Sequence, residues 1–319
     1  MEHYSQTLDL PFSNICLSFR ELKTKDQILL SKAIMSFSNK KEDFLNYHNF
    51  VLNIISKCVQ NVNDIEKINI IEYVLFLVKF RMISIGTSVS FLLNTDGTKK
   101  TKLKIDLKTY LTNLYNASMS IRDDELLTDK DVEIKISWPN IKSIPNFYKS
   151  LLNNSNEYFL INNTLYEFIE HIKFNGKKII LTNFSSQEKQ NIFERLSVSL
   201  KQKIQDIVIN KVKFLIESDL FELSYFKDYK FNLYTMSFLE HIRLFFSYDL
   251  KSLYQEIYIL SGSGLSTEYI MDISPTERNI YFTIMQEQKA SQNKKSSPED
   301  NIPNQSLENL ALEFGDVPP

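Results

Sequence analysis

Residues 73–93 read YVLFLVKFRMISIGTSVSFLL, and the spacing of the apolar side chains changes within this stretch. Up to Arg81 the apolar residues continue a helical repeat, which predicts a buried helix. Beyond Arg81 the period becomes two, because Val89, Phe91 and Leu93 recur at every second position. The chain therefore passes directly from a helix into a β-strand, which is typical of an α+β fold.

A second alternating segment follows Asp96-Gly97 and predicts a β-hairpin at about 87–107. Its apolar positions are Leu103, Ile105 and Leu107. A two-residue turn at Asp96-Gly97 would place Val89 on the face of the lysines. A three-residue loop, with residues 94–97 as a type I turn and Gly97 in the left-handed bulge position, puts both apolar sets on one face. We predict the bulged turn.

Further elements complete an N-terminal domain. Alternation from Ile15 to Arg20 predicts a strand, and Thr24 is a candidate N-cap for the helix after it. Apolar spacing predicts helices at 44–59, 65–78 and 108–117, an acidic connection at 122–131 and a strand at 132–136. We place the first boundary near Trp138-Pro139, so that residues 1–138 form an α+β domain.

The rest of the chain is mostly helical in its periodicity. Helices are predicted at 158–174, 185–216 and 235–260, with a β-like segment at 178–181. Gly262 and Gly264 end the last of these as C-cap residues, and Ser274-Pro275-Thr276-Glu277 starts another helix as a capping box with proline at its first position. Residues 139–290 are thus a mainly helical domain. The predicted fold class is α+β, predominantly α-helical, with a β-hairpin-containing N-terminal domain and a helical second domain.

Residues 291–319 are rich in Gln, Asn, Lys, Ser and Pro, which predicts a disordered C-terminal tail. Four apolar residues interrupt it at helical spacing: Leu307, Leu310, Ala311 and Phe314. Such a stripe orders on the groove of a partner, remains inert, or packs weakly on its own domain, and the sequence leaves these alternatives open.

Composition narrows the class of function. The 319-residue chain carries a net charge of -2, which gives no overall attraction to nucleic acid or to an anionic membrane. Its 6 glycines leave little material for phosphate-binding loops. Cys16 and Cys58 lack the spacing of a zinc site, and the apolar run at 73–78 is far shorter than the roughly 20 residues of a membrane helix. We expect protein partners and no membrane insertion.

No catalytic constellation emerges from the motifs. The histidines at positions 3, 48, 171 and 241 are not paired at metal-ligand spacing, and no nucleophile elbow or nucleotide-binding loop occurs. We therefore predict no catalytic, cofactor-binding or metal-binding residues, no cofactor and no small-molecule substrate. Two alternatives stay open: an unrecognised helical enzyme with dispersed catalytic residues, and a nucleic-acid-binding module built on the lysines at 99, 100, 102 and 104.

Two groups of residues resemble a known family. Residues 17–26 are similar to the opening of the T4-type baseplate hub and hub-assembly protein family, in which a strand and an arginine precede a helix. Residues 81–86 resemble a second feature of that family, in which a helix runs into Arg, Ser and Gly before a hairpin. This resemblance covers roughly residues 14–117. Residues 274–281 also resemble the Pro-x-Glu-Arg-x-x-Tyr ending of T4-like tail proteins. Residues 118–246 carry no part of the resemblance.

The resemblance implies a role in the central hub of a contractile-tail baseplate, as a particle component or as an assembly factor. The implied partners are other phage baseplate hub or tail proteins, and the implied locations are the host cytoplasm during assembly and the virion tail. The resemblance and the tail stripe together give the candidate interaction residues: Arg20, Arg81, Gly86, Pro275, Glu277, Arg278, Tyr281, Leu307, Leu310 and Phe314.

Overall fold

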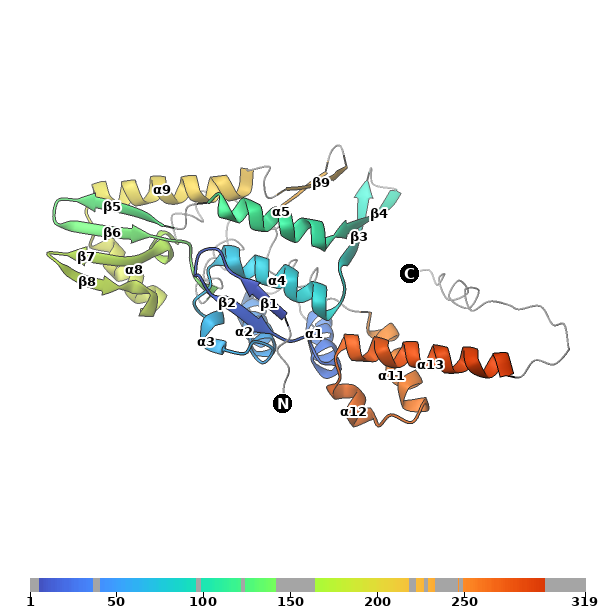
Figure 1. The fold of residues 1–319 in the computed structure, drawn as a ribbon. Helices are drawn as coiled ribbons and strands as arrows, with labels where there is room; N and C mark the ends of the chain where they lie inside the picture. The colour runs from blue at the N-terminus through green and yellow to red at the C-terminus, as the bar shows by residue number, and fades with distance from the viewer. Residues whose placement is uncertain are drawn as a thin grey trace. The chain divides into compact units, whose positions relative to one another are not determined.

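The computed structural model describes residues 6–36, 41–95, 99–121, 124–141, 164–217, 222–226, 229–232, 246 and 249–295. The chain divides into two compact units, Met1–Pro275 and Thr276–Pro319. Within the described residues helix predominates over strand (Figure 1), which confirms the predominantly helical α+β fold class.

The first half of the unit Met1–Pro275 contains, in chain order, β1 (Gln6–Asp9), β2 (Cys16–Phe19), α1 (Thr24–Ser36), α2 (Lys41–Ser56), α3 (Val62–Ile65), α4 (Ile70–Ser84), β3 (Ser88–Thr95), β4 (Lys99–Asp106) and α5 (Leu107–Met119). The second half contains β5 (Glu125–Asp129), β6 (Val132–Ile136), the 3-10 helix η2 (Leu165–Phe168), β7 (Ile169–Phe174), β8 (Lys177–Ile180), η3 (Leu181–Asn183), α8 (Ser186–Glu194), α9 (Val198–Glu217), β9 (Glu222–Phe226), β10 (Tyr229–Asn232), α11 (Leu250–Gly262) and α12 (Thr267–Asp272). The helix α13 (Pro275–Lys295) makes up the described part of the unit Thr276–Pro319.

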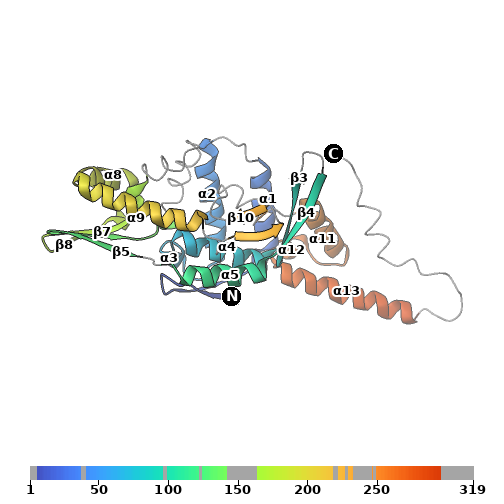
Figure 2. The same cartoon turned by 90° about the horizontal axis from the view of Figure 1, so that it is seen from above.

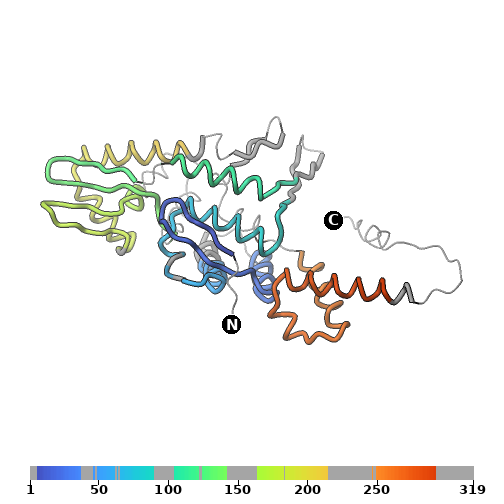
Figure 3. Tube along the Cα trace, viewed as in Figure 1, coloured from blue at the N-terminus to red at the C-terminus, as the bar shows by residue number. Residues whose placement is uncertain are grey.

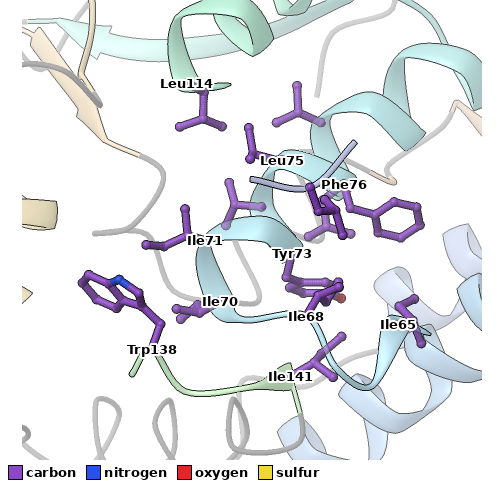
Figure 4. Close-up of a cluster of buried hydrophobic side chains, with 14 of the residues drawn as sticks. Ile65, Ile68, Ile70, Ile71, Tyr73, Leu75, Phe76, Leu114, Trp138 and Ile141 are labelled. Carbon is purple, nitrogen blue, oxygen red and sulfur yellow. The ribbon is translucent and has the colours of Figure 1, made fainter. Parts of the chain in front are cut away.

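Helix α4 lies at the centre of the hydrophobic core (Figure 4) because it is apolar around nearly its whole circumference. Phe76 packs edge-to-face on Phe19 of β2, with ring centroids 5.2 Å apart. The apolar run at 73–78 is thus a buried core helix, as predicted. The predicted helix at 65–78 is wrong at its start, since Asn69 is extended (φ -88°, ψ 174°) and caps α4 separately from α3.

The β3–β4 hairpin pairs Val89 with Ile105 and Phe91 with Leu103, so odd positions face odd positions. This confirms that both apolar sets share one face. The predicted turn is displaced, however, because Asn94 and Thr95 are the last residues of the strand and Thr95 pairs with Lys99. Residues 96–98 lie outside the described residues. The apolar alternation determines the face, and a shift of the pairing by two residues leaves that face unchanged.

A four-stranded antiparallel sheet has the order β5-β6-β7-β8, and its two hairpins lie side by side (Figure 3). Helices α8 and α9 lie on one side of this sheet (Figure 2). Two predictions fail here. The acidic connection at 122–131 contains the strand β5, and the part of the predicted helix at 158–174 that the structure describes is η2 and β7. The β-like segment at 178–181 is confirmed as β8.

The other predicted elements are largely confirmed. The strand at 16–19 and the helices at 41–56, 107–119, 186–217 and 250–262 match the predicted segments, with a break at 195–197 and with residues 233–245 outside the description. Gly264 (φ 98°) closes α11 through hydrogen bonds from its own N–H to Ser261 O and from Leu265 N–H to Leu260 O, whereas Gly262 is still helical. Helix α13 begins at Pro275, as predicted.

The cap predicted at Thr24 is wrong. Thr24 is already the first residue of α1, and its hydroxyl donates to the carbonyl of Ile273 at 3.0 Å. The boundary predicted near Trp138-Pro139 lies inside the unit Met1–Pro275. Strand β6 before this boundary pairs with β7 after it. That residues 1–138 and 139–290 form separate domains stays a prediction.

Candidate protein-interaction site

Arg81 connects the end of the core helix α4 to the start of the β3–β4 hairpin. Its Nη1 donates to the carbonyl of Gly86 at 3.0 Å and its Nη2 to that of Ser88 at 3.5 Å. Gly86 has a φ of 135°, and no atom stands within 4 Å of where a Cβ would lie, so the backbone conformation rather than crowding favours glycine there. The guanidinium therefore fixes the direction in which the hairpin leaves the core.

Arg20 has a similar internal role at the end of β2. Its Nη1 donates to the carbonyl of Glu21 at 2.9 Å and its Nη2 to that of Lys57 at 3.1 Å, and Nη1 lies 3.9 Å from the Asp26 carboxylate. A guanidinium makes such divergent bonds because its donors fan out in one plane. Arg20 thus ties β2 to the end of α2 and to the start of α1.

Ser84 joins the two regions. Its hydroxyl accepts the Leu22 N–H at 3.1 Å, and its carbonyl accepts the Gln27 amide at 2.7 Å. All of these groups are buried, so the bonds form in a low-dielectric setting where an unpaired partner would be costly. The family-like residues of the N-terminal part therefore build the base of the hairpin from within, and they contact the chain's own backbone.

Asp106 finishes the base of the hairpin on its other strand. Its carboxylate accepts the Lys108 N–H at 3.1 Å and the Thr109 hydroxyl at 2.9 Å, which caps α5 and lowers the pKa of Asp106. The N–H of Leu107 also donates to the carbonyl of Thr87 at 2.8 Å. Both ends of the hairpin are thus fixed to helices.

Beyond this base the pairing register of the hairpin separates two kinds of residue. Positions 91 and 103 continue the apolar face whose first pair, Val89 and Ile105, is buried. The opposite register positions carry Lys100, Lys102 and Lys104, together with Leu92, which pairs with Lys102. We call residues 88–106 the arm, and it is the candidate site for partner binding.

The C-terminal family-like residues lie on α13. Pro275 and Glu277 are in its first turn, and Arg278 and Tyr281 are one helical turn apart. Arg278 is buried, with 2% of its surface exposed. Tyr281 is half-buried. The tail residues Leu307, Leu310 and Phe314 lie outside the described residues.

A cavity of about 410 Å³ lies beside the start of α4. Its lining includes three carboxylates, Glu66, Glu72 and Glu170. The Glu72 carboxylate accepts hydrogen bonds from backbone N–H groups, and the Glu170 carboxylate lies 2.9 Å from the Nζ of Lys135. His171 stands on a strand rather than on the predicted helix, with its Nδ1 3.4 Å from Glu170. The Ser13 hydroxyl in the lining donates to Oε1 of Glu72 at 3.0 Å, so the carboxylates of Glu72 and Glu170 both have partners within the chain.

In the described part of the chain, no group of three or more His, Cys, Asp or Glu side chains could hold a metal ion. No helix among these residues has the length and apolar character needed to cross a membrane.

Sequence reasoning missed two internal networks. Asn69 and Glu72 form a capping box whose Asn-x-x-Glu spacing is visible in the sequence. The ion pair between Glu167 and Lys189 has no such local signal, because its partners come from different elements.

Comparison with known proteins identifies one family. The family model described as T4 bacteriophage base plate protein matches residues 1–219, which is more than half of the chain and includes the arm and the four-stranded sheet. No curated protein and no solved structure matches the chain. The chain belongs to the T4 bacteriophage base plate protein family.

Proposed function

We propose that this chain is a structural or assembly protein of the baseplate hub of a T4-like contractile tail. It acts through contacts with other hub or tail proteins, in the host cytoplasm during assembly and in the tail baseplate, and has no catalytic role. Family membership supports the baseplate setting. The observation that supports action through protein contacts is the anchoring of the arm by Arg81 and Asp106 at its base.

A braced two-stranded ribbon suits protein docking for a physical reason. Ordering a loop on binding costs conformational entropy, whereas a hairpin that is already paired and anchored loses little. Its register also offers apolar and basic positions on opposite sides, which gives a partner both burial and charge to recognise. We therefore assign partner recognition to the arm.

The test shortens the arm without changing its base. Residues 91–103 are replaced by Asn-Gly, which lets Ser90 pair with Lys104 across a two-residue turn. We expect an unchanged melting temperature, loss of hub proteins from pull-downs of infected lysate, and incomplete tails by electron microscopy. Normal hub recovery with the shortened arm would contradict the proposal.

A matched variant tests the tail separately. A chain ending after Lys295 lacks the stripe of Leu307, Leu310 and Phe314 but keeps α13. If the stripe orders on a partner, this chain keeps its melting temperature and loses hub association. Undiminished recovery would show that the tail has no such role.

Mass spectrometry of purified particles then distinguishes a virion component from an assembly factor.

A further inference from the structure

The four-stranded sheet has two edges of opposite charge. Within the described residues β5 and β8 are its outermost strands. The acidic edge, β5, carries Glu125 and Asp129, and the basic edge, β8, carries Lys177 and Lys178. No ion pair joins Asp129 or Lys177 to another group in the part of the chain that the structure describes.

Both edges also expose aliphatic side chains. Leu126 on the acidic edge is 60% exposed, and Ile179 and Ile180 on the basic edge are 41% and 46% exposed. An open edge with exposed apolar residues is a template for pairing with another strand. These residues therefore mark both edges as candidates for strand addition.

The pairing register across the four strands aligns residues of β5 with residues of β8. One line of paired residues runs from Leu126 through Lys135 and His171 to Ile180. The next line begins at Leu127 and ends at Ile179.

A third line begins at Asp129 and ends at Lys177. Because all pairs are antiparallel, the two outer strands run in opposite directions. When a second copy is added at the edge of the sheet, its β5 runs antiparallel to β8 of the first copy, and the residues of the two strands are aligned in the same register.

We propose that the basic edge of one copy pairs with the acidic edge of a second copy, which continues the sheet between the two molecules. Leu126 then lies opposite Ile180, Leu127 opposite Ile179, and Asp129 opposite Lys177. Direction, aliphatic positions and charge all match, and both halves of the interface belong to the same chain. This makes a second copy, rather than an unrelated strand, the occupant.

Such an interface is head-to-tail, so each added copy leaves one edge of either kind available for the next. The association therefore grows into a ring or a chain rather than stopping at a two-fold dimer. This inference is independent of the hub role, because it concerns only contacts between copies of this chain.

The test measures the mass of the full-length protein by sedimentation over a range of concentrations. Wild type should associate increasingly as its concentration rises. Asp129→Lys and Lys177→Glu should each weaken association about tenfold, since each replaces an attractive cross-strand pair with a repulsive one. A wild type that stays monomeric up to about 1 mM, the weak end of specific affinities, overturns the proposal.

Recombining the charges tests the pairing itself. An equimolar mixture of the Asp129→Lys and Lys177→Glu proteins should associate again, as should the double variant, because opposite charges then face each other. Lys178→Glu is the matched control, since the register sets Lys178 level with Thr128, and it should weaken association less. Failure of both the mixture and the double variant to recover, or an equal loss in the control, overturns the proposed register.

Discussion

Glu72 and Ser13 are joined through a single carboxylate oxygen, although 59 residues separate them. Oε1 of Glu72 accepts the backbone N–H of Ser13 at 2.7 Å and its hydroxyl at 3.0 Å. The same oxygen accepts the N–H of Phe12 at 2.8 Å, and Oε2 accepts that of Asn69 at 3.3 Å. The capping box of α4 thus also holds the turn between β1 and β2 against the core helix.

Replacing Glu72 with alanine should lower the free energy of unfolding by about 3 kcal/mol, because the N–H groups of Phe12, Ser13 and Asn69 lose a charged acceptor. Glu72→Gln keeps one acceptor oxygen and should lose about half as much. Urea denaturation followed by circular dichroism measures both.

The nearby Glu66 is exposed and provides the control for this variant. Glu66→Ala should change the free energy of unfolding by less than about 0.5 kcal/mol. Equal effects of the two alanine variants would show that the carboxylate of Glu72 does not hold the turn.

The hairpin and the helices were predictable because their signals are local. The alternation around Val89 and Ile105 fixed the face of each strand without knowledge of any distant contact. Residues 169–174 were misassigned, since Ile169 and Ile172 are spaced as in a helix. The stronger signal was Asn175-Gly176, whose φ angles of 48° and 78° form the tight turn between β7 and β8.

Strand β5 was missed for a different reason. It is an edge strand in which Leu126 and Thr128 are exposed, so its sequence lacks a continuous apolar face. The roles of Arg20 and Arg81 were likewise beyond sequence reasoning. Their acceptors are backbone carbonyls, which every residue carries, so the side chains gave no sign that these arginines bind internally.

A buried ion pair holds η2 to α8. The Nζ of Lys189 lies 2.7 Å from Oε2 of Glu167, and the two side chains are 6% and 0% exposed. The Ser186 hydroxyl also donates to Glu167. Lys189→Met should lower the free energy of unfolding by about 3–5 kcal/mol, because it leaves a buried carboxylate without its cation.

The double variant Lys189→Met with Glu167→Gln should recover part of that loss, since a neutral amide costs less to bury than a charge. A thermodynamic cycle from chemical denaturation measures the coupling. Additive losses in the double variant would contradict a direct ion pair.

Tyr110 on α5 carries a hydroxyl that is buried without a hydrogen-bond partner among the described residues. Burial raises the pKa of this phenol. Tyr110→Phe should raise the free energy of unfolding by about 1 kcal/mol, because it removes an unsatisfied polar group from the core. Tyr115→Phe on the same helix, where the ring is half-buried, should shift the midpoint of denaturation less. A loss of stability in Tyr110→Phe would indicate a partner for the hydroxyl.

Asp249 caps α11 and gives a test by pH. The Ser252 hydroxyl, at 2.6 Å, and then the Lys251 N–H, at 3.0 Å, lower the pKa of its carboxyl. A carboxyl whose pKa is lower in the folded protein stabilises the fold above its unfolded pKa of about 3.9, and this contribution disappears as the pH falls through the folded value.

Asp249→Ser keeps a capping oxygen that does not titrate. The difference in melting temperature between wild type and Asp249→Ser should therefore stay constant from pH 7 to about 5 and move in favour of the variant below about pH 4. A difference that is flat down to about pH 2, or a carboxyl titration by NMR with its midpoint at or above about 3.9, would contradict the lowered pKa.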